Sequence, residues 1–394
     1  MKKRNTAYFI FIMLGMLTAF GPFVTDMYLP SLPSMTEHFD TSIPMVQLGL
    51  TFSMFGMAFG QLVFGPLSDK YGRRRPLLTA MILFLISTFA CIFAPNIEIF
   101  VFLRLIQGIA AAGGIVIARS IAADKFKGRN LAKAFSIVGA INGMAPVVAP
   151  ITGGLALGIT GWQGIFVILF FWGILLTIVS SNFKESLSKT RRSKEKLSKS
   201  FNLFRNVFKN KMFVYSTFQM AFTMAILFAY ISASPFIIQT HYGFSPFAFS
   251  LFFAANATAI GAGAAISSRF KNQEFILKIS NIGMIICSIL LLIFLADNMT
   301  IVFFESALFA LCFMMGMTFP VTVAFALNSA RKQAGTASAV LGASGFLSGS
   351  IVSPIVGIGN ILVTAGIIFT VSSISAALFA FLAAQYRKEH RYVS

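Results

Sequence analysis

Apolar stretches of about 20 residues alternate with short polar segments along almost the whole chain of 394 residues. A helix needs about 20 apolar residues, each rising about 1.5 Å, to cross a hydrocarbon core of about 30 Å. The pattern therefore predicts an all-α membrane protein with twelve transmembrane helices in two six-helix bundles. The predicted spans are residues 7–30, 45–66, 77–95, 99–119, 133–157, 162–182, 212–238, 247–267, 275–296, 300–327, 337–359 and 361–384.

The longest polar segment divides the spans into two sets of six. It predicts an N-terminal bundle over residues 1–183, a cytoplasmic basic linker over 184–211 and a C-terminal bundle over 212–394. Apolar residues recur among basic ones in the second part of the linker, which favours either an amphipathic helix on the anionic inner leaflet or a solvated tether. These apolar residues are Phe201, Leu203, Phe204, Val207 and Phe208.

Composition and charge placement agree with this map. Hydrophobic residues make up 57% of the chain and charged residues 11%, which leaves too little polar surface for a water-soluble protein. All of the 31 Lys and Arg residues except Arg104 fall on one side of the predicted spans, which predicts both termini in the cytoplasm. The net charge of +19 thus indicates topology and lipid contact, not a nucleic-acid partner. The first apolar stretch lacks an A-x-A-like cleavage site, and we expect it to be a retained helix.

Three charged side chains fall inside predicted spans, away from the cytoplasmic ends: Asp26, Arg104 and Glu305. Charges in the membrane are costly and usually functional. We expect Asp26, which follows Gly21-Pro22, to gain and lose the coupling proton; an Asp wetted at the outer interface is the alternative. Glu305 stands near the start of its span, where a hydrated interfacial Glu is expected.

Arg104 cannot lose its charge, so it needs carbonyl groups, water or a carboxylate as partners. Gln107 follows on nearly the same helix face, and the small residues from Gly108 to Gly114 permit close helix packing. We expect Arg104 and Gln107 to bond the first helix near Asp26 and to respond to its protonation. A purely structural buried Arg is the alternative.

The segment GPLSDKYGRRRP, residues 65–76, resembles the signature loop of the major facilitator superfamily, G-x-L-[AS]-D-[RK]-x-G-R-[RK]. Its glycines, Gly65 and Gly72, suit a tight turn and close helix contact, and Asp69 is suited to helix N-termini and basic neighbours. The resemblance implies the major facilitator fold. It also implies that Asp69, Arg73 and their surroundings, including Arg74, latch the two bundles in the outward-open state.

Two further motifs resemble proton-coupled members of this superfamily. Arg104, Gln107 and Gly108 match the R-x-x-Q-G motif of the fourth helix. INGMAPVVAPITGG in the fifth span resembles the antiporter motif G-P-x-x-G-G, with Ala149 in place of the first Gly. The motif residues are Pro146, Ala149, Pro150, Gly153 and Gly154.

The segments TDMYLPSLP, AYISASPFIIQ and AGTASAVLG are similar to the bicyclomycin/chloramphenicol-resistance (Bcr/CflA) group of drug:proton antiporters. The resemblance implies a monomeric exporter of small apolar or cationic drug-like molecules in the bacterial inner membrane, with Asp26 as the proton site. Export of an amino acid, peptide or other metabolite is one alternative. An uncoupled carrier or a membrane sensor is another.

Soft aromatic and Met-rich faces offer a wall that tolerates varied substrates. The candidate substrate-binding residues are Tyr28, Asn142, Met144, Phe228, Tyr230, Ser234 and Phe236. Cys91, Cys287 and Cys312 lack metal-like spacing, and no G-x-x-x-x-G-K-[ST] segment occurs. The sequence therefore predicts no metal, no cofactor except the proton as coupling ion, and no enzymatic activity.

Overall fold

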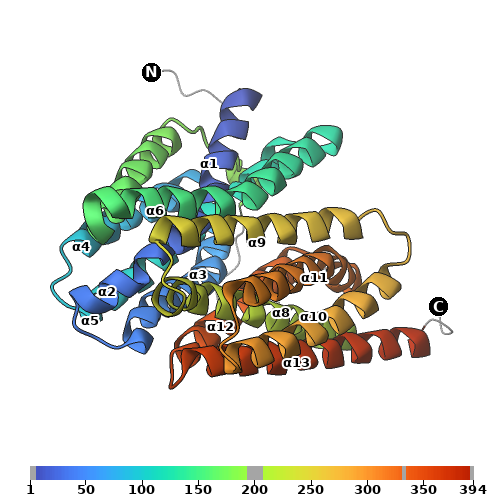
Figure 1. Ribbon diagram of the computed structural model, residues 1–394. Helices are drawn as coiled ribbons and strands as arrows, with labels where there is room; N and C mark the ends of the chain where they lie inside the picture. The colour runs from blue at the N-terminus through green and yellow to red at the C-terminus, as the bar shows by residue number, and fades with distance from the viewer. Residues whose placement is uncertain (1–5, 193–206, 331–333, 391–394) are drawn as a thin grey trace. The chain divides into compact units, whose positions relative to one another are not determined.

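The computed structural model describes residues 6–192, 207–330 and 334–390, and these form helices joined by short turns (Figure 1). The chain forms two compact units, Met1–Ser200 and Phe201–Ser394. The boundary between them lies within the segment predicted as the linker. The hypothesis of an amphipathic helix over 201–208 falls mostly outside the described residues.

The first unit is built from long helices that mostly follow the predicted spans. Its elements are α1 (Ala7–Asp26), the 3-10 turn η1 (Leu29–Ser31), α2 (Leu32–His38), α3 (Ile43–Tyr71), α4 (Arg74–Ile92), α5 (Ile97–Lys125), α6 (Gly128–Ser181) and the 3-10 turn η2 (Lys189–Arg191). Helix α1 continues through Pro22 and ends at Asp26, earlier than predicted. Helix α3 continues to Tyr71, past its predicted end, because hydropathy marks the apolar part of a helix and not its full length.

Helix α6 contains two of the predicted spans. Among the described residues, eleven helices are long and apolar enough to cross a membrane, and one of them covers the 43 residues Gly139–Ser181. A straight helix of that length would measure about 65 Å, more than twice the hydrocarbon thickness. Gly161 interrupts it with φ 68° and ψ −173°, between the predicted spans 133–157 and 162–182. The break divides this helix into two spans, and the predicted twelve-helix fold is confirmed.

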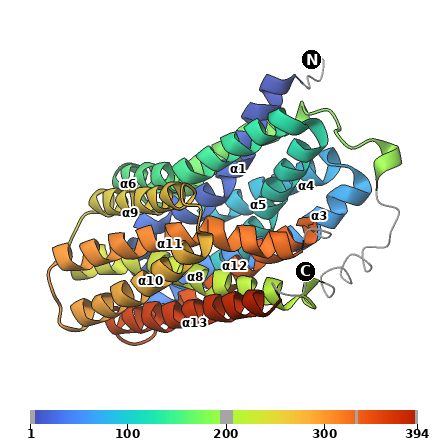
Figure 2. The ribbon, with the colours of Figure 1, turned by 90° about the vertical axis from the view of Figure 1, so that its right-hand side faces the viewer.

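The second unit repeats the same kind of architecture. Its elements are α8 (Lys211–Pro235), the π-helical turn η3 (Phe236–His241), α9 (Pro246–Ser267), α10 (Gln273–Ala296), α11 (Ile301–Ser329), α12 (Ala334–Val356) and α13 (Ile361–His390). Helix α13 packs against α8 and α10, and α11 packs against α9 (Figure 2).

Glycines let pairs of helices approach closely in both units. A Cβ on Gly56 of α3 would overlap the Leu105 carbonyl oxygen of α5, and one on Gly108 of α5 would overlap that of Ser53. In the second unit, Gly263 of α9 and Gly316 of α11 face the backbone of the opposite helix in the same way. Small residues at such contacts are typical of membrane helices, whose association depends on close van der Waals packing. The packing role predicted for the small residues that begin at Gly108 is confirmed at that glycine.

Candidate functional site

Arg104 on α5 is fully buried and makes its contacts inside the first unit. Its Nη2 donates to the carbonyl oxygen of Val24 at 2.9 Å, and its Nη1 donates to Oε1 of Gln107. The guanidinium carbon lies 4.2 Å from the ring centre of Tyr28. Val24 belongs to the last turn of α1, where carbonyl groups have no partner within the helix. Arg104 therefore satisfies a helix end and places a positive charge where the helix dipole is negative.

Gln107 connects Arg104 to a third helix. Its Nε2 donates to Oγ1 of Thr88 on α4 at 2.7 Å, while its Oε1 accepts from Arg104. The prediction that Arg104 bonds the first helix is confirmed by its contact with Val24, but Gln107 bonds α4 and not α1. Gln107 therefore orients the guanidinium, and the hydrogen-bonded chain extends from α1 through α5 to α4.

Asp26 is the last residue of α1, and its side chain is enclosed by the protein. The residue is only 5% exposed, so the alternative of an Asp26 wetted at the outer interface is wrong. Its Oδ1 accepts a hydrogen bond from the hydroxyl of Thr25 at 2.7 Å. Asp26 takes part in none of the ion pairs among the described residues. The side chain is thus an enclosed acid, two residues from the carbonyl that Arg104 binds.

The segment that resembles the antiporter motif packs directly against this end of α1. A Cβ on Gly153 of α6 would overlap the carbonyl oxygen of Met27, the residue after Asp26. Ala149, Pro150 and Gly154 on the same helix are also buried, and Pro146 is partly exposed. Helix α6 can therefore lie against the Asp26 segment only because residue 153 has no side chain.

We expect Gly153→Ala to lower the stability of the protein. Its methyl group would force the backbone of α1 and α6 apart, and overpacking of this kind costs about 1–3 kcal/mol. Thermal unfolding of the purified protein would measure the effect. Gly158→Ala is the matched control, because Gly158 lies on the same helix with no atom within 4 Å of its added Cβ. Equal behaviour of the two variants would contradict the close contact.

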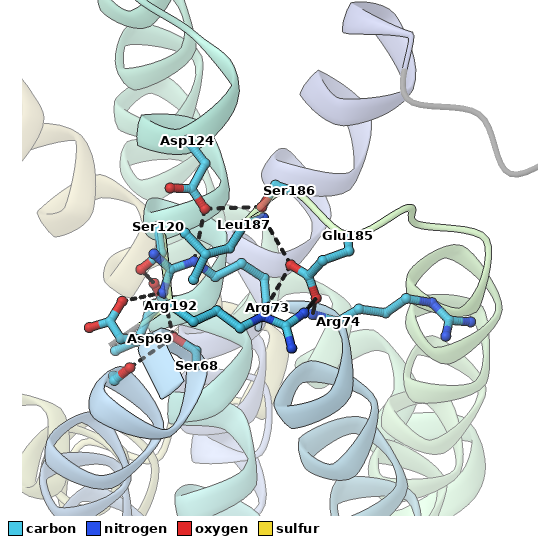
Figure 3. Close-up of polar contacts among 12 residues, drawn as sticks. Ser68, Asp69, Arg73, Arg74, Ser120, Asp124, Glu185, Ser186, Leu187 and Arg192 are labelled. Atoms are coloured by element: carbon cyan, nitrogen blue, oxygen red, sulfur yellow. Dashed lines mark hydrogen bonds and ion pairs between the residues drawn. The ribbon is translucent and has the colours of Figure 1, made fainter. Parts of the chain in front are cut away.

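The segment that resembles the signature loop forms a network of charges at one end of the first unit (Figure 3). Arg73, which precedes α4, donates from Nη1 to Asp69 at 2.5 Å and from Nε to Asp124 of α5 at 2.9 Å. It also donates to the hydroxyl of Ser68 at 2.8 Å. Burial alone would lower the pKa of Arg73, but its bonds to Asp124 and Asp69 outweigh burial and raise the pKa above its ordinary value. Arg73 thus keeps its charge and ties α3, α4 and α5 together.

The helix-end role that we predicted for Asp69 belongs to Glu185. The Glu185 carboxylate accepts from the backbone N–H of Arg73 at 2.8 Å and of Arg74 at 3.1 Å (Figure 3). It therefore caps the first turn of α4, where N–H groups lack partners. Asp69 bonds the Arg73 side chain instead, as expected for a basic neighbour. Arg74 donates to the carbonyl oxygen of Ser181 at 2.9 Å.

Of the two glycines in this segment, only Gly72 is required by the backbone. It has φ 90°, a conformation that favours glycine, and a Cβ there would meet the Glu185 carboxylate. Gly65 lies inside α3, and its Cβ would make an ordinary contact of 3.7 Å with Val116. The expected tight turn at Gly65 is therefore wrong, because the helix continues through it. That this network latches two bundles stays a prediction, since its contacts described above lie within the first unit.

A sequence profile of the Major Facilitator Superfamily matches residues 14–354. The chain is 37% identical over 376 residues to the uncharacterized MFS-type transporter YdgK of Bacillus subtilis, covering 94% of each. It is 28% identical to a bicyclomycin resistance protein homolog of Haemophilus influenzae, covering 98% of this chain and 99% of the relative. The chain belongs to the Major Facilitator Superfamily. A crystal structure of a bacterial homologue of the human lysosomal transporter Spinster has the same fold, with a TM-score of 0.74, 17% identity and 97% coverage of both chains.

Membership of the Major Facilitator Superfamily makes this chain a multi-pass membrane transporter rather than an enzyme. Its fold also shows why three residues of the charged network escaped sequence analysis. Asp124, Glu185 and Ser186 lie far along the chain from Arg73 and match no motif, yet Ser186 donates to Asp124 at 3.0 Å. The one available signal was that Asp124 and Glu185 are acids among the basic residues of the segments predicted to be cytoplasmic.

The candidate substrate-binding residues of this superfamily member are mostly buried. Tyr28 is fully buried beneath Arg104, while Met144 of α6 is 64% exposed and the side chain of Asn142 lies outside the described part. In the second unit the four candidates are buried; the Tyr230 ring stacks on Phe253 at 5.3 Å. These four residues are Phe228, Tyr230, Ser234 and Phe236. Their role in substrate binding stays a prediction, and Met144 alone has a well-exposed side chain among those described.

Proposed function

We propose that this transporter exports small apolar or cationic drug-like molecules across the bacterial cytoplasmic membrane in exchange for protons. The drug class is supported by the relative named for bicyclomycin resistance, which matches almost the full length of both chains. In this proposal both termini lie in the cytoplasm, and the protein works by alternating access of a central site to the two sides of the membrane.

The single observation that carries proton coupling is the enclosed carboxyl group of Asp26. It is 5% exposed and accepts a hydrogen bond from Thr25 at 2.7 Å. Such groups inside membranes commonly serve as proton relays because an unpaired charge there is costly. Arg104 keeps its charge at all relevant pH values, so of these two neighbours only Asp26 can change its charge.

The exchange cycle follows from one group that holds either a proton or a negative charge. Asp26 takes a proton when its site opens to the outside, and the protonated transporter returns to the inward-open state. On the inside, arrival of a substrate favours release of the proton, and the loaded transporter then opens outward. Arg104, fixed by Val24 and Gln107, keeps the end of α1 in place while Asp26 changes its charge.

Proton movement in liposomes tests this cycle. A pH-sensitive dye trapped inside liposomes with the purified protein should report proton flux when a gradient of drug is imposed, and liposomes without protein should show none. A drug that equilibrates without proton flux would identify an uncoupled carrier. In parallel, cells that overproduce the protein should resist several unrelated antibiotics and dyes. Resistance to toxic metabolite analogues alone would identify a metabolite exporter.

A further inference from the structure

The second unit has an acid of its own within a predicted span, Glu305. Glu305 stands in the second turn of α11, and its Oε1 accepts a hydrogen bond from Nδ2 of Asn256 on α9 at 2.7 Å. Asn256 is completely buried. Glu305 is partly exposed near the start of its span, as expected, but its carboxyl group turns toward α9 and its Oε2 is buried, so the expectation of a hydrated carboxyl group is wrong.

Each residue of this pair has one oxygen atom that accepts no hydrogen bond from the described residues. Glu305 Oε2 and Asn256 Oδ1 are both buried, and neither has a hydrogen-bond partner among the described residues. Two acceptor oxygens cannot bond each other, and a buried acceptor without a donor is costly. One proton on Glu305 would change this, because Oε2 would then be a donor.

We propose that Glu305 and Asn256 form a second proton-binding site of this protein. A protonated carboxyl group and a primary amide can join through two hydrogen bonds in a ring. The amide N–H donates to Oε1, as it does here, and the acid O–H donates to the amide oxygen. The proton thus satisfies both unused oxygens at once. This site does not require that Asp26 couple transport.

The charged residues of the neighbouring elements lie at the far ends of their helices or are exposed. Helices α9 and α12, which pack on α11, contain no ionisable side chain, and the charged residues of α10, Glu274 and Lys278, lie in its first turns. Helix α8 also packs on α11, and its charged residue, Lys211, begins the helix, at the end away from Tyr242, whose hydroxyl donates to the Met299 carbonyl. At the Glu305 end of α11, Asp297 and His241 are both exposed to solvent. The other ionisable groups of these elements are Cys312 on α11, Cys287 on α10 and Tyr230 on α8, whose ring stacks on Phe253 of α9, and such groups are ordinarily uncharged near neutral pH. The ion pairs among the described residues do not include Glu305.

The site belongs to the second unit alone. Gly108 of α5 and Gly316 of α11 hold equivalent places, because each abuts the backbone of its partner helix. Glu305 precedes Gly316 by as many residues as Ile97 precedes Gly108, so Ile97 of α5 holds the place equivalent to Glu305. In the same way, Asn256 precedes Gly263 by as many residues as Gly49 precedes Gly56, so Gly49 of α3 holds the place equivalent to Asn256. At these two equivalent positions the first unit has neither an acid nor an amide, and its enclosed Asp26 lies on α1.

Infrared difference spectroscopy between acidic and alkaline pH, on the purified protein in lipid, tests the site without substrate. The spectra are recorded in the Asp26→Asn background, which removes the enclosed acid of α1. We expect a carbonyl band of a protonated carboxylic acid that is lost in Glu305→Gln. This variant keeps the fold, because the Gln amide can make both hydrogen bonds to Asn256. Glu98→Gln is the matched control, since Glu98 is exposed in the first turn of α5, and it should leave the band unchanged.

Asn256→Leu should shift the band to higher frequency, because the acid carbonyl loses its hydrogen bond; Asn256→Ser gives the same test if the Leu variant does not fold. A spectrum that Glu305→Gln leaves unchanged, or a band that neither Asn256 variant shifts, would overturn the proposal. Either result leaves the proposed drug export intact, because no step of the measurement involves transport.

Discussion

Asp26→Asn is expected to abolish proton-driven export while the protein folds normally. Asn has nearly the same size as Asp, and its amide oxygen can still accept the Thr25 hydroxyl that lies 2.7 Å from Oδ1. The amide cannot take up or release a proton, so the step that a proton gradient drives is lost. Drug resistance should fall to the level of cells without the protein.

Exchange of substrate across liposomes without any gradient should survive in Asp26→Asn, because exchange requires alternating access and no change of protonation. This combination separates coupling from folding and from substrate binding. Asp40→Asn is the matched control, since Asp40 is exposed and Asn tolerates its positive φ of 46°. Full proton-driven export by Asp26→Asn would refute the coupling role of Asp26.

The sequence predicted the helices well because lipid imposes a simple rule. Every backbone polar group in a membrane must be satisfied within a helix, so apolar length and loop charge define the spans. The break at Gly161 falls between the predicted spans 133–157 and 162–182, although α6 is otherwise one continuous helix from Gly128 to Ser181. The ends of α1 and α3 were not predicted correctly, because helices continue or stop for reasons that hydropathy does not record.

The sequence predicted those residues of the candidate site that carry a charge within an apolar span or lie close to such a residue in the chain. Asp26 and Arg104 were found because charges within apolar spans are conspicuous, and Gln107 because it follows on the same helix face. Partners that depend on tertiary packing were not found. Asp124 lies 51 residues from Arg73 and Glu185 lies 112 residues from it, so nothing in the local pattern connects them. The Asn256–Glu305 contact escaped for the same reason, since Asn256 carries no charge that would make it conspicuous.

Arg104→Lys is expected to lower stability by about 2 kcal/mol and the rate of export about tenfold or more. The guanidinium bonds Val24 and Gln107 through two different nitrogens while its plane lies over Tyr28. A Lys ammonium is a compact point charge without this planar fork. It cannot keep both bonds and the ring contact at full burial, so α1 loses its cap beside Asp26. Thermal unfolding and initial rates of drug export measure the two losses.

Arg387→Lys provides the matched control for this substitution. The Arg387 guanidinium bonds one carboxylate, from Nη1 to Oε1 of Glu274 at 2.8 Å, and its carbon atom lies 3.7 Å from the ring centre of Phe325. The Arg387 side chain is 22% exposed, so water can replace a hydrogen bond that Lys does not make. A surface ion pair of this kind contributes little to stability. The same chemical change should therefore cost far more at Arg104 than at Arg387. Equal small losses would mean that the end of α1 is held without the guanidinium, and Arg104 would then have no part in positioning Asp26.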